Sequence, residues 1–270
     1  MLWIGGPQGS GKSSIARALS RRFDLQLYVI DHRVWVHEPR MPATEFSSLS
    51  MDERWVHAAP ERMLDWFGNT SRHRFRLVLE DLRELAGSPL AVVEGPQLFP
   101  TFVAAVLRDP AHALFAIPDP GEQRERLLAR PGLPGTSDPR RARINATERD
   151  LMIAQRFARE ARELRLTVLP ADRPLDEMIA LAVEHFRPVI ERGPREVDLA
   201  ALRRFENDVL AMQVRRYRES LGPLNPDDAP LSFACECGAS GCDEEIELSL
   251  DDYDALSAGG DRSRLRGPTP

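Results

Sequence analysis

Lysine is almost absent from this chain of 270 residues, because Lys12 is the only lysine among 36 basic side chains. All the other basic residues are arginine, whose wide planar guanidinium does a different job from the compact ammonium of lysine. A position that keeps lysine against this compositional preference needs a small point charge. Lys12 is therefore the first candidate for a functional residue.

Long apolar runs are also missing. No stretch approaches the roughly 18 apolar residues that a membrane-spanning helix needs. Met1 leads directly into a short apolar run, which leaves no room for the charged start of a signal peptide. No block of basic residues interleaved with aromatic residues is present either. We therefore expect a cytoplasmic protein whose partners are neither membranes nor nucleic acids.

Cysteine is scarce and clustered, since Cys235, Cys237 and Cys242 are the only three. An odd number of cysteines in a reducing compartment argues against a disulfide framework. Three thiolates are one short of a closed tetrahedral zinc site, and no histidine follows His185. The sequence therefore favours a small β-rich module with reduced, buried thiols, and leaves a zinc site as the alternative.

Lys12 lies in a glycine-rich segment, Gly-Pro-Gln-Gly-Ser-Gly-Lys-Ser, that covers residues 6–13. In such a loop, glycines let backbone N–H groups wrap phosphates, the lysine reaches the β- and γ-phosphates, and the last serine binds Mg²⁺. An apolar run precedes the segment and apolar residues at helical spacing follow it, in the strand, loop and helix order that the motif requires. We predict a site for the phosphates of ATP at Gly6, Gly9, Ser10, Gly11, Lys12, Ser13 and Ser14.

Short apolar runs recur along the first 190 residues, as buried parallel strands tend to do. The predicted strands are Leu2–Gly5, Leu25–Ile30, Leu90–Glu94, Ala113–Pro118 and Leu166–Leu169. Predicted helices lie at about 12–23, 52–67, 71–86, 100–108, 121–130, 144–164 and 174–187. Five strands alternating with helices predict an α/β fold with a doubly wound parallel sheet, whose ligands bind at the carboxyl ends of the strands.

The chain divides into four predicted parts. An α/β domain covers 1–192 with a lid at about 121–145, an amphipathic helix covers 193–221, a cysteine-containing module covers 222–256, and a flexible tail covers 257–270. Within the lid, 131–143 is rich in turn-forming residues and predicts a mobile loop. The module is strongly acidic, because residues 227–254 hold ten acidic side chains and no basic one.

Two acidic residues follow predicted strands and are candidates for catalysis. Asp31 comes directly after the second strand, where it can orient or deprotonate an attacking hydroxyl, or simply cap the next segment. Glu94 ends the third strand after four apolar residues, which is typical of a Walker B carboxylate that organises Mg²⁺ together with Ser13. A plain strand-end turn is the alternative for Glu94. His32 and Arg33, which directly follow Asp31, fit a solvated loop at least as well as a substrate contact.

Arginines in the predicted lid can neutralise the charge that spreads over a transferred phosphoryl group. Arg126 and Arg130 are four residues apart, on one face of a predicted helix, and Arg140, Arg141 and Arg143 follow in the loop. Each of these arginines taken alone also fits a surface charge.

The region 33–76 holds candidates for an acceptor pocket, although core packing explains them equally well. These candidates are Trp35, Trp55, Trp66, Phe67 and Arg74. The acidic pair Glu80 and Asp81, in a predicted helix, is expected on a solvated face, with one of the two facing the cleft as the alternative.

Together these motifs resemble the nucleoside-monophosphate-kinase-like P-loop kinases, a group that includes shikimate kinase, gluconate kinase and chloramphenicol phosphotransferase. The resemblance covers about residues 1–190 and rests on residues 6–13, Asp31, Glu94-Gly95, the arginine-bearing lid and the closing segment 168–177. It implies that Asp31 contacts or deprotonates the acceptor, and that the closing segment touches adenine near Ala171 and Asp172.

Two features depart from the pattern of that group. The third strand ends in Glu-Gly-Pro, and the region 33–76 matches no member, so the resemblance leaves the substrate open. The arginine-rich composition and the cysteine segment resemble those of actinobacterial proteins that carry a cysteine-containing tail.

The sequence therefore predicts a kinase that uses ATP and Mg²⁺ to phosphorylate a hydroxyl of a small molecule, such as a sugar, nucleoside, cyclitol or antibiotic-like metabolite. The predicted catalytic residues are Lys12, Asp31, Glu94, Arg126 and Arg130, with Arg130 and Asp172 also contacting the nucleotide. The alternative is a nucleotide-binding regulatory ATPase that acts as a switch through a protein partner. Residues 196–256 are the expected surface for such a partner or for a homodimer.

Overall fold

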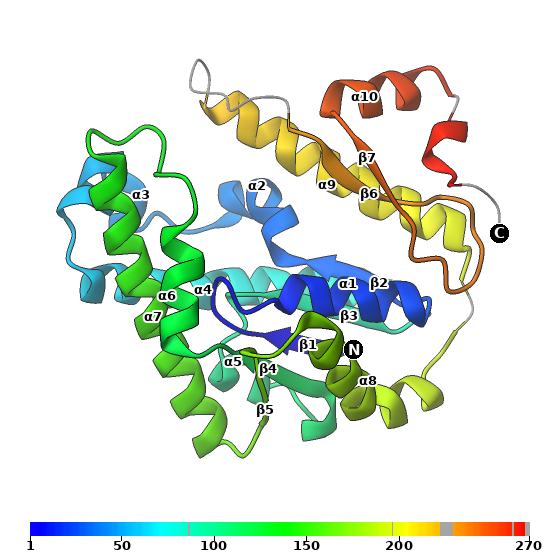
Figure 1. Cartoon of the computed structure of the whole chain (residues 1–270), viewed down its shortest axis with the longest axis horizontal. Coiled ribbons are helices and arrows are strands. Elements are labelled where there is room, and N and C mark those ends of the chain that lie inside the picture. The colour runs from blue at the N-terminus through cyan, green and yellow to red at the C-terminus, as the bar shows by residue number, and fades with distance from the viewer. Residues whose placement is uncertain (86, 196, 222–228, 261, 268–270) are drawn as a thin grey trace.

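The computed structural model describes residues 1–85, 87–195, 197–221, 229–260 and 262–267. A central sheet lies between two layers of helices, and the C-terminal part of the chain packs beside this α/β unit (Figure 1). Within the described ranges, no helix combines the length and the apolar character needed to cross a membrane.

Five strands form the sheet, in the order β2-β3-β1-β4-β5 and all parallel. They are β1 (Leu2–Gly5), β2 (Gln26–Val29), β3 (Ala91–Gly95), β4 (Ala113–Ile117) and β5 (Thr167–Pro170). This sheet confirms the predicted doubly wound α/β class. After β1 the chain fills β2 and β3 on one side, and then crosses to β4 on the other, so a crevice opens at the carboxyl end of β1.

Helices cover both faces of the sheet. The helices of the α/β unit are α1 (Lys12–Arg22), α2 (Val34–His37), α3 (Glu45–Ser48), α4 (Pro60–Glu84), α5 (Pro100–Ala104), α6 (Pro120–Leu128), α7 (Pro139–Glu163) and α8 (Leu175–Arg192). One apolar core joins α1 and α8 to the first face, and a second core joins α4, α5 and α7 to the other. The three central strands, β3, β1 and β4, are almost wholly buried, which explains their continuous apolar runs.

The long helix α4 corrects the prediction of two helices at 52–67 and 71–86. Gly68 lies inside α4, where a Cβ atom would come within 2.9 Å of the guanidinium of Arg156 on α7. The glycine therefore makes room for a close helix–helix contact and does not break the helix. Residues 53–57 form a separate π-helical turn before α4.

The lid also differs from its prediction. The helix α6 ends at Leu128, and α7 already begins at Pro139, so 131–143 is not one loop. Asp138 caps α7 by accepting a hydrogen bond from the backbone N–H of Arg141, and Pro139 takes the first helical position. The loop between α6 and α7 is fixed to the segment before α4, because the backbone N–H of Ser137 donates a hydrogen bond to the Asp52 carboxylate at 2.7 Å.

The predicted C-terminal helix is confirmed as α9 (Leu199–Leu221), but its inward face is not simply apolar. Phe205 and Tyr217 are 45% and 44% exposed, whereas Arg203 and Asn207 are buried. Polar side chains therefore carry much of the contact between α9 and the rest of the molecule.

Glu206 of α9 is the centre of that contact. It accepts hydrogen bonds from the Arg21 guanidinium at 2.8 Å, from the backbone N–H of Leu27 at 2.8 Å and from Arg203 at 3.0 Å. Arg203 also donates to the Ser20 carbonyl oxygen at 3.0 Å. This network fastens α9 to α1 and β2.

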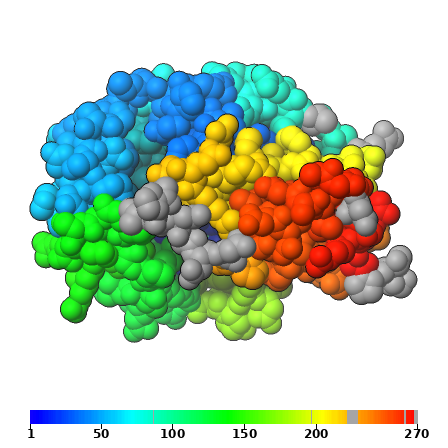
Figure 2. All heavy atoms as spheres, turned by 90° about the horizontal axis from the view of Figure 1, so that it is seen from above, coloured from blue at the N-terminus to red at the C-terminus, as the bar shows by residue number. Residues whose placement is uncertain are grey.

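A small module follows α9 and packs on it. It contains β6 (Leu231–Ala234), its antiparallel partner β7 (Glu245–Leu248), and α10 (Leu250–Ala258). Its core is built around Phe233 and Tyr253, whose rings stack at 4.2 Å. Seen from above, α9 and this module cover much of one face of the molecule (Figure 2).

The predicted flexible tail is wrong for its described part. Leu265 is fully buried, and its carbonyl oxygen accepts a hydrogen bond from the backbone N–H of Glu236 at 2.7 Å. Arg262 donates two hydrogen bonds to the Glu236 carboxylate. The start of the predicted module, residues 222–228, lies outside the described residues, and the predicted boundaries between the four parts stay predictions.

The Glu206 network predicts a large loss of stability for Glu206→Ala. The change leaves the buried guanidinium groups of Arg21 and Arg203 without their carboxylate, so we expect the free energy of unfolding to fall by about 3–5 kcal/mol. Glu219→Ala is the matched control, because Glu219 pairs with Arg216 on the exposed face of α9 and should cost less than about 1 kcal/mol. Urea unfolding measures both, and equal losses would contradict the role assigned to Glu206.

Candidate active site

The loop between β1 and α1 has the backbone that the glycine-rich motif predicts. Gly9 and Gly11 adopt left-handed φ angles of 79° and 76°, and Gly11 is the N-cap of α1. No side chain caps the helix, so its first N–H groups are left for a ligand. Such an N-terminus favours anions, because the helix dipole adds to the exposed N–H donors.

Lys12 and Glu94 lie close together at this loop, and both are buried. Lys12 is 5% exposed at the start of α1, while Glu94 is 2% exposed near the end of β3, where it pairs in register with Ile4 of β1. Burial raises the pKa of the Glu94 carboxyl, and the Lys12 ammonium and a hydrogen bond with Ser13 act against this rise. The Oε2 atom of Glu94 has no hydrogen-bond partner among the described residues.

The oxygen atoms at this point suit a hard cation. The Ser13 hydroxyl and the Glu94 carboxylate lie together, and oxygen ligands of this kind are the ones that Mg²⁺ prefers. The buried, unpartnered Oε2 atom is the position that such a cation, or a water bound to it, would satisfy. The residues present therefore fit Mg²⁺.

Asp31 lies in the 3₁₀ turn that follows β2, and its carboxylate faces the end of β3. The side-chain amide of Gln97 donates a hydrogen bond to Asp31 at 2.8 Å. Gln97 is buried and comes three residues after Glu94, in the turn that leaves β3. We did not predict Gln97 as a site residue, because a glutamine in a turn carries no signal in a single sequence.

A cavity of about 310 Å³ opens beside these acids. Its α/β wall includes Ser13, Asp31 and Glu94, and its other wall comes from the C-terminal part of the chain. That second wall is formed by Phe205, Glu206, Asn207, Val209 and Leu210 of α9 and by Leu231, Ser232, Ala234 and Glu245 of the module. Arg17 of α1 pairs with Glu245 of β7 at 3.2 Å and links the two walls.

His32 and Arg33 line the same cavity and do not form a solvated loop. Burial lowers the pKa of His32 to about 4, so its imidazole is neutral at neutral pH. The Arg33 guanidinium lies over the rings of Tyr28 and Phe205, 5.4 Å from each centroid. These contacts place a fixed cation at the cavity wall.

A second cavity of about 260 Å³ is lined by Gln97, whereas the first is lined by its hydrogen-bond partner Asp31. Phe67 and Arg74, both predicted for an acceptor pocket, line the second cavity, and the Arg74 guanidinium donates to Glu38 at 3.2 Å. The other three predicted residues do not line it: Trp35, Trp55 and Trp66. Asp31 and Gln97 therefore stand between two cavities.

Arg126 is the lid arginine that reaches the loop. Its guanidinium donates to the carbonyl oxygens of Gly9 at 3.4 Å and Ala171 at 3.2 Å, so it joins the loop to the closing segment. Arg130 lies beyond the end of α6 and not on its face, which corrects the prediction of a shared helix face. Burial lowers the pKa of Arg143, and the nearby charge of Arg130 lowers this pKa further.

Further contacts hold the lid helix and the closing segment at the loop. The buried side chain of Gln123 donates to the carbonyl oxygen of Gln8 at 2.8 Å, and Ala171 is buried, with its N–H donating to Ile117. Asp172, predicted to contact adenine, is exposed beside it. The role of Asp172 stays a prediction.

Asp81 is not on a solvated face, which corrects its prediction. The Tyr28 hydroxyl donates to it at 2.6 Å, and it lies 3.0 Å from Nε2 of the fully buried His37. Arg40 pairs with both Asp81 and Glu80. This network anchors α4 to β2, and its Tyr28 also lines the first cavity.

No family model matches the chain, and no curated protein does. Solved structures with a similar fold include the following three. TT1252 from Thermus thermophilus shares 25% identity over 71% of this chain and 96% of its own, at a TM-score of 0.43. A gluconokinase from Sinorhizobium meliloti 1021 shares 18% identity over 70% of this chain and 93% of its own, at a TM-score of 0.36. A shikimate kinase from Bacteroides thetaiotaomicron shares 16% identity over 70% and 97%, also at 0.36.

Two of the three carry the names of kinases in the group that the sequence resembles. At TM-scores below 0.5, none of these likenesses decides what the chain does. Its fold class rests on its own sheet order, and its chemistry on the residues described above.

The buried carboxyl of Glu94 predicts a variant that is more stable than the wild type near neutral pH. Since the pKa of Glu94 is raised in the folded state, this group favours folding while protonated, and that contribution is lost as the pH rises through the folded pKa. We expect Glu94→Gln to raise the melting temperature near neutral pH by about 2–4 °C, the effect of ~1 kcal/mol in a chain of this size. The gain should vanish below about pH 4, where the carboxyl is protonated in both states.

Calorimetry of the ligand-free protein across this pH range measures the effect. Glu80→Gln is the control, because Glu80 is exposed and pairs with Arg40 at the surface. A Glu94→Gln protein that melts below the wild type near neutral pH would contradict the cost assigned to the buried charge.

Proposed function

We propose that the protein is a phosphotransferase that moves the γ-phosphoryl group of ATP, with Mg²⁺, to a hydroxyl of a small-molecule acceptor. One observation carries this proposal. Lys12, Ser13, Asp31 and Glu94 come from three separate elements and meet at the carboxyl edge of a parallel sheet, beside a cavity. Each of these side chains suits a different part of phosphoryl transfer.

The nucleotide half of the reaction belongs to the loop and α1. ATP lies along residues 9–14, with its phosphates against the uncapped N–H groups of α1 and the Lys12 ammonium between the β- and γ-phosphates. Arg126 already spans Gly9 and Ala171, so it lies where the lid meets the nucleotide. The resemblance to P-loop kinases supports adenine beside Ala171 and Asp172.

Ser13 and Glu94 are the residues that would hold Mg²⁺. When bound, the cation supplies positive charge that neutralises the phosphate oxygens during transfer. The burial of Glu94 keeps water from competing for its carboxylate, and the hydrogen bond with Ser13 keeps the two oxygen donors together.

Asp31 is the residue that acts on the acceptor. It accepts the proton of the acceptor hydroxyl as that oxygen bonds to the γ-phosphorus, the bond to the β,γ-bridging oxygen breaks, and ADP leaves. Gln97 positions Asp31, because its amide donor fixes the orientation of the carboxylate. The neutral His32 beside Asp31 leaves the charge of the carboxylate uncompensated on that side.

The cavity of about 310 Å³ is the proposed acceptor site. It touches Ser13, Asp31 and Glu94 directly, whereas the second cavity reaches Asp31 only through Gln97. Its volume lies at the small end of ligand sites, and its wall carries charges of both signs. These properties favour a compact, hydroxyl-rich acceptor such as a sugar or a cyclitol.

A screen of hydroxylated metabolites for ADP release tests the proposal. We expect one compact class to stimulate ADP release, and Lys12→Ala to lower that rate by at least about 10²-fold, because the phosphates lose their buried cation. Arg22→Ala is the control on the same helix, since Arg22 is exposed. If no metabolite changes ATP turnover but a protein partner accelerates it, the regulatory-ATPase alternative replaces the proposal.

Asp31→Asn separates binding from transfer. Asparagine keeps the size of the side chain but cannot accept the proton, so kcat should fall by about 10²–10⁴-fold. Calorimetric titration should still give the wild-type affinity for a non-hydrolysable ATP analogue, because Asp31 lies on the acceptor side. Retention of the wild-type kcat would place the base at another residue.

A further inference from the structure

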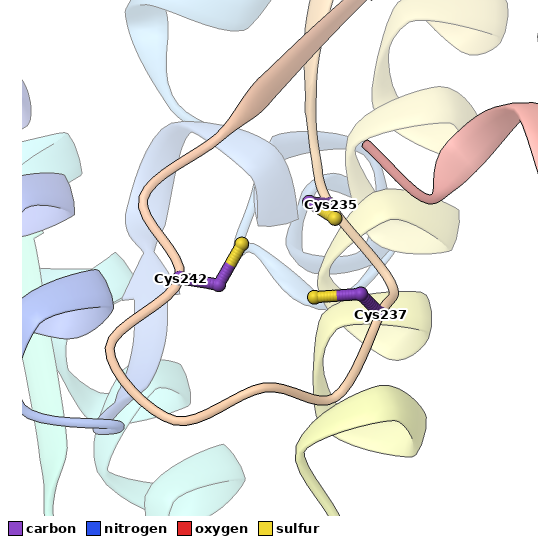
Figure 3. A group of neighbouring side chains, drawn as sticks. All are labelled: Cys235, Cys237 and Cys242. Atoms are coloured by element: carbon purple, nitrogen blue, oxygen red, sulfur yellow. The ribbon is translucent and has the colours of Figure 1, made fainter. Parts of the chain in front are cut away.

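The three cysteines of the C-terminal module form a group that the proposed reaction does not use. The Sγ atoms of Cys235, Cys237 and Cys242 all lie within 4.8 Å of one another, and the sulfurs point into one space between β6 and β7 (Figure 3). We propose that this group binds one Zn²⁺ ion through three thiolates. The sequence alone favoured a metal-free module, and the convergence of all three sulfurs changes that balance.

The loop that carries the cysteines is shaped around their sulfurs. Gly238 and Gly241 adopt left-handed φ angles of 76° and 69°, which turn the chain so that Cys242 faces back toward the other two. The backbone N–H of Ala239 donates to the Cys237 sulfur at 3.4 Å, and the N–H of Gly267 donates to the Cys235 sulfur at 3.2 Å. Donors of this kind stabilise thiolates and orient them as ligands.

The donor set selects the kind of metal. Three thiolates are soft ligands, which favour Zn²⁺ over the oxygen-preferring Mg²⁺ of the proposed active site. In the described part of the chain, no other histidine, cysteine or carboxylate has a ligand atom within 4.8 Å of all three sulfurs. The fourth tetrahedral position is therefore assigned to water, and each thiol releases its proton as it binds.

A metal clamp suits the size of the module. The core of the module holds six buried residues: Ala211, Phe233, Leu248, Leu250, Tyr253 and Leu265. A unit this small gains little from apolar burial alone, and natural domains of such size are often held by metals or disulfides. The three cysteines form no disulfide with one another. A metal ion bound by all three sulfurs is therefore the cross-link that their geometry allows.

The clamp lies next to the cavity wall. Cys235 directly follows β6, and β7 begins three residues after Cys242, while Ser232, Ala234 and Glu245 of these strands line the cavity. The cysteine loop is also tied to the α/β unit, because Asp24 accepts hydrogen bonds from Ser240 and Gly241. Zinc would thus fix the strands that close the acceptor site. This consequence rests on the proposed function, whereas the metal site does not.

Elemental analysis of the full chain, purified without a histidine tag, tests the metal site directly. We expect about one zinc per chain, and a loss of most of it in Cys237→Ser and Cys242→Ser. Ser240→Ala is the matched control, because it alters a hydrogen bond of the same loop and no thiolate, and it should retain the zinc. Replacement by Co²⁺ should add the ultraviolet charge-transfer bands of thiolate ligation.

The measurements do not depend on phosphoryl transfer, so failure of the kinase proposal leaves them interpretable. If a cysteine variant fails to fold, zinc released from the wild type by a thiol-reactive reagent should reach about one per chain. The site would be overturned if the folded protein, as purified, contains no zinc and all three of its thiols are alkylated. A disulfide detected by mass, or undiminished zinc in Cys242→Ser, would also overturn it.

Discussion

The proximity of Lys12 and Glu94 inside the protein is the constraint on which the site depends. Each is a charged residue with almost no exposure, and neither is stable there without an opposite charge. In the proposed reaction Lys12 is committed to phosphates, and Glu94 then requires a second cation. In that reaction the Glu94 carboxylate, whose charge the nearby Lys12 ammonium offsets in the ligand-free protein, would become a ligand for Mg²⁺. Each of the two buried charges would then have an opposite charge near it both before and after the ligands bind, and neither side chain would need to become exposed.

The C-terminal part of the chain supplies one wall of the cavity at the candidate site. The α9 network around Glu206 fixes the helix on α1 and β2, and the same glutamate lines the cavity. Arg17 connects the phosphate-loop helix to β7 through Glu245. The surfaces that could have served a protein partner are therefore engaged, at least in part, within the chain. A partner or homodimer contact through 196–256 stays a proposal for the faces that remain exposed.

Much of the fold and the centre of the site could be predicted from the sequence, because both depend on local patterns. Apolar runs give the strands, and a phosphate loop is recognisable wherever its glycines, lysine and serine keep their spacing. Asp31 and Glu94 were identified because they follow strands, and the structure brings both to the cavity. What remained hidden depends on contacts between distant residues. Gln97, the polar face of α9 and the cavity wall from β6 and β7 carry no local signal.

The corrections have physical causes of the same kind. Gly68 continues a helix because another helix needs the space, and Leu265 is ordered because it fills the core of the module. Asp81 is held inside by Tyr28 and His37, which no helical periodicity could reveal. The sequence predicted a flexible tail and a solvated Asp81, whereas tertiary contacts bury Leu265 of that tail and hold Asp81 against Tyr28 and His37.

The cavity joins parts of the chain that are made at very different times. Arg17 and Glu245, which link its two walls, are separated by 228 positions. A nascent chain that has left the ribosome as far as α8 already holds the complete sheet and the phosphate loop. It still lacks α9, β6 and β7, so the cavity has only one of its two walls. Under the proposed function, such a chain would bind ATP before the site for its acceptor is complete.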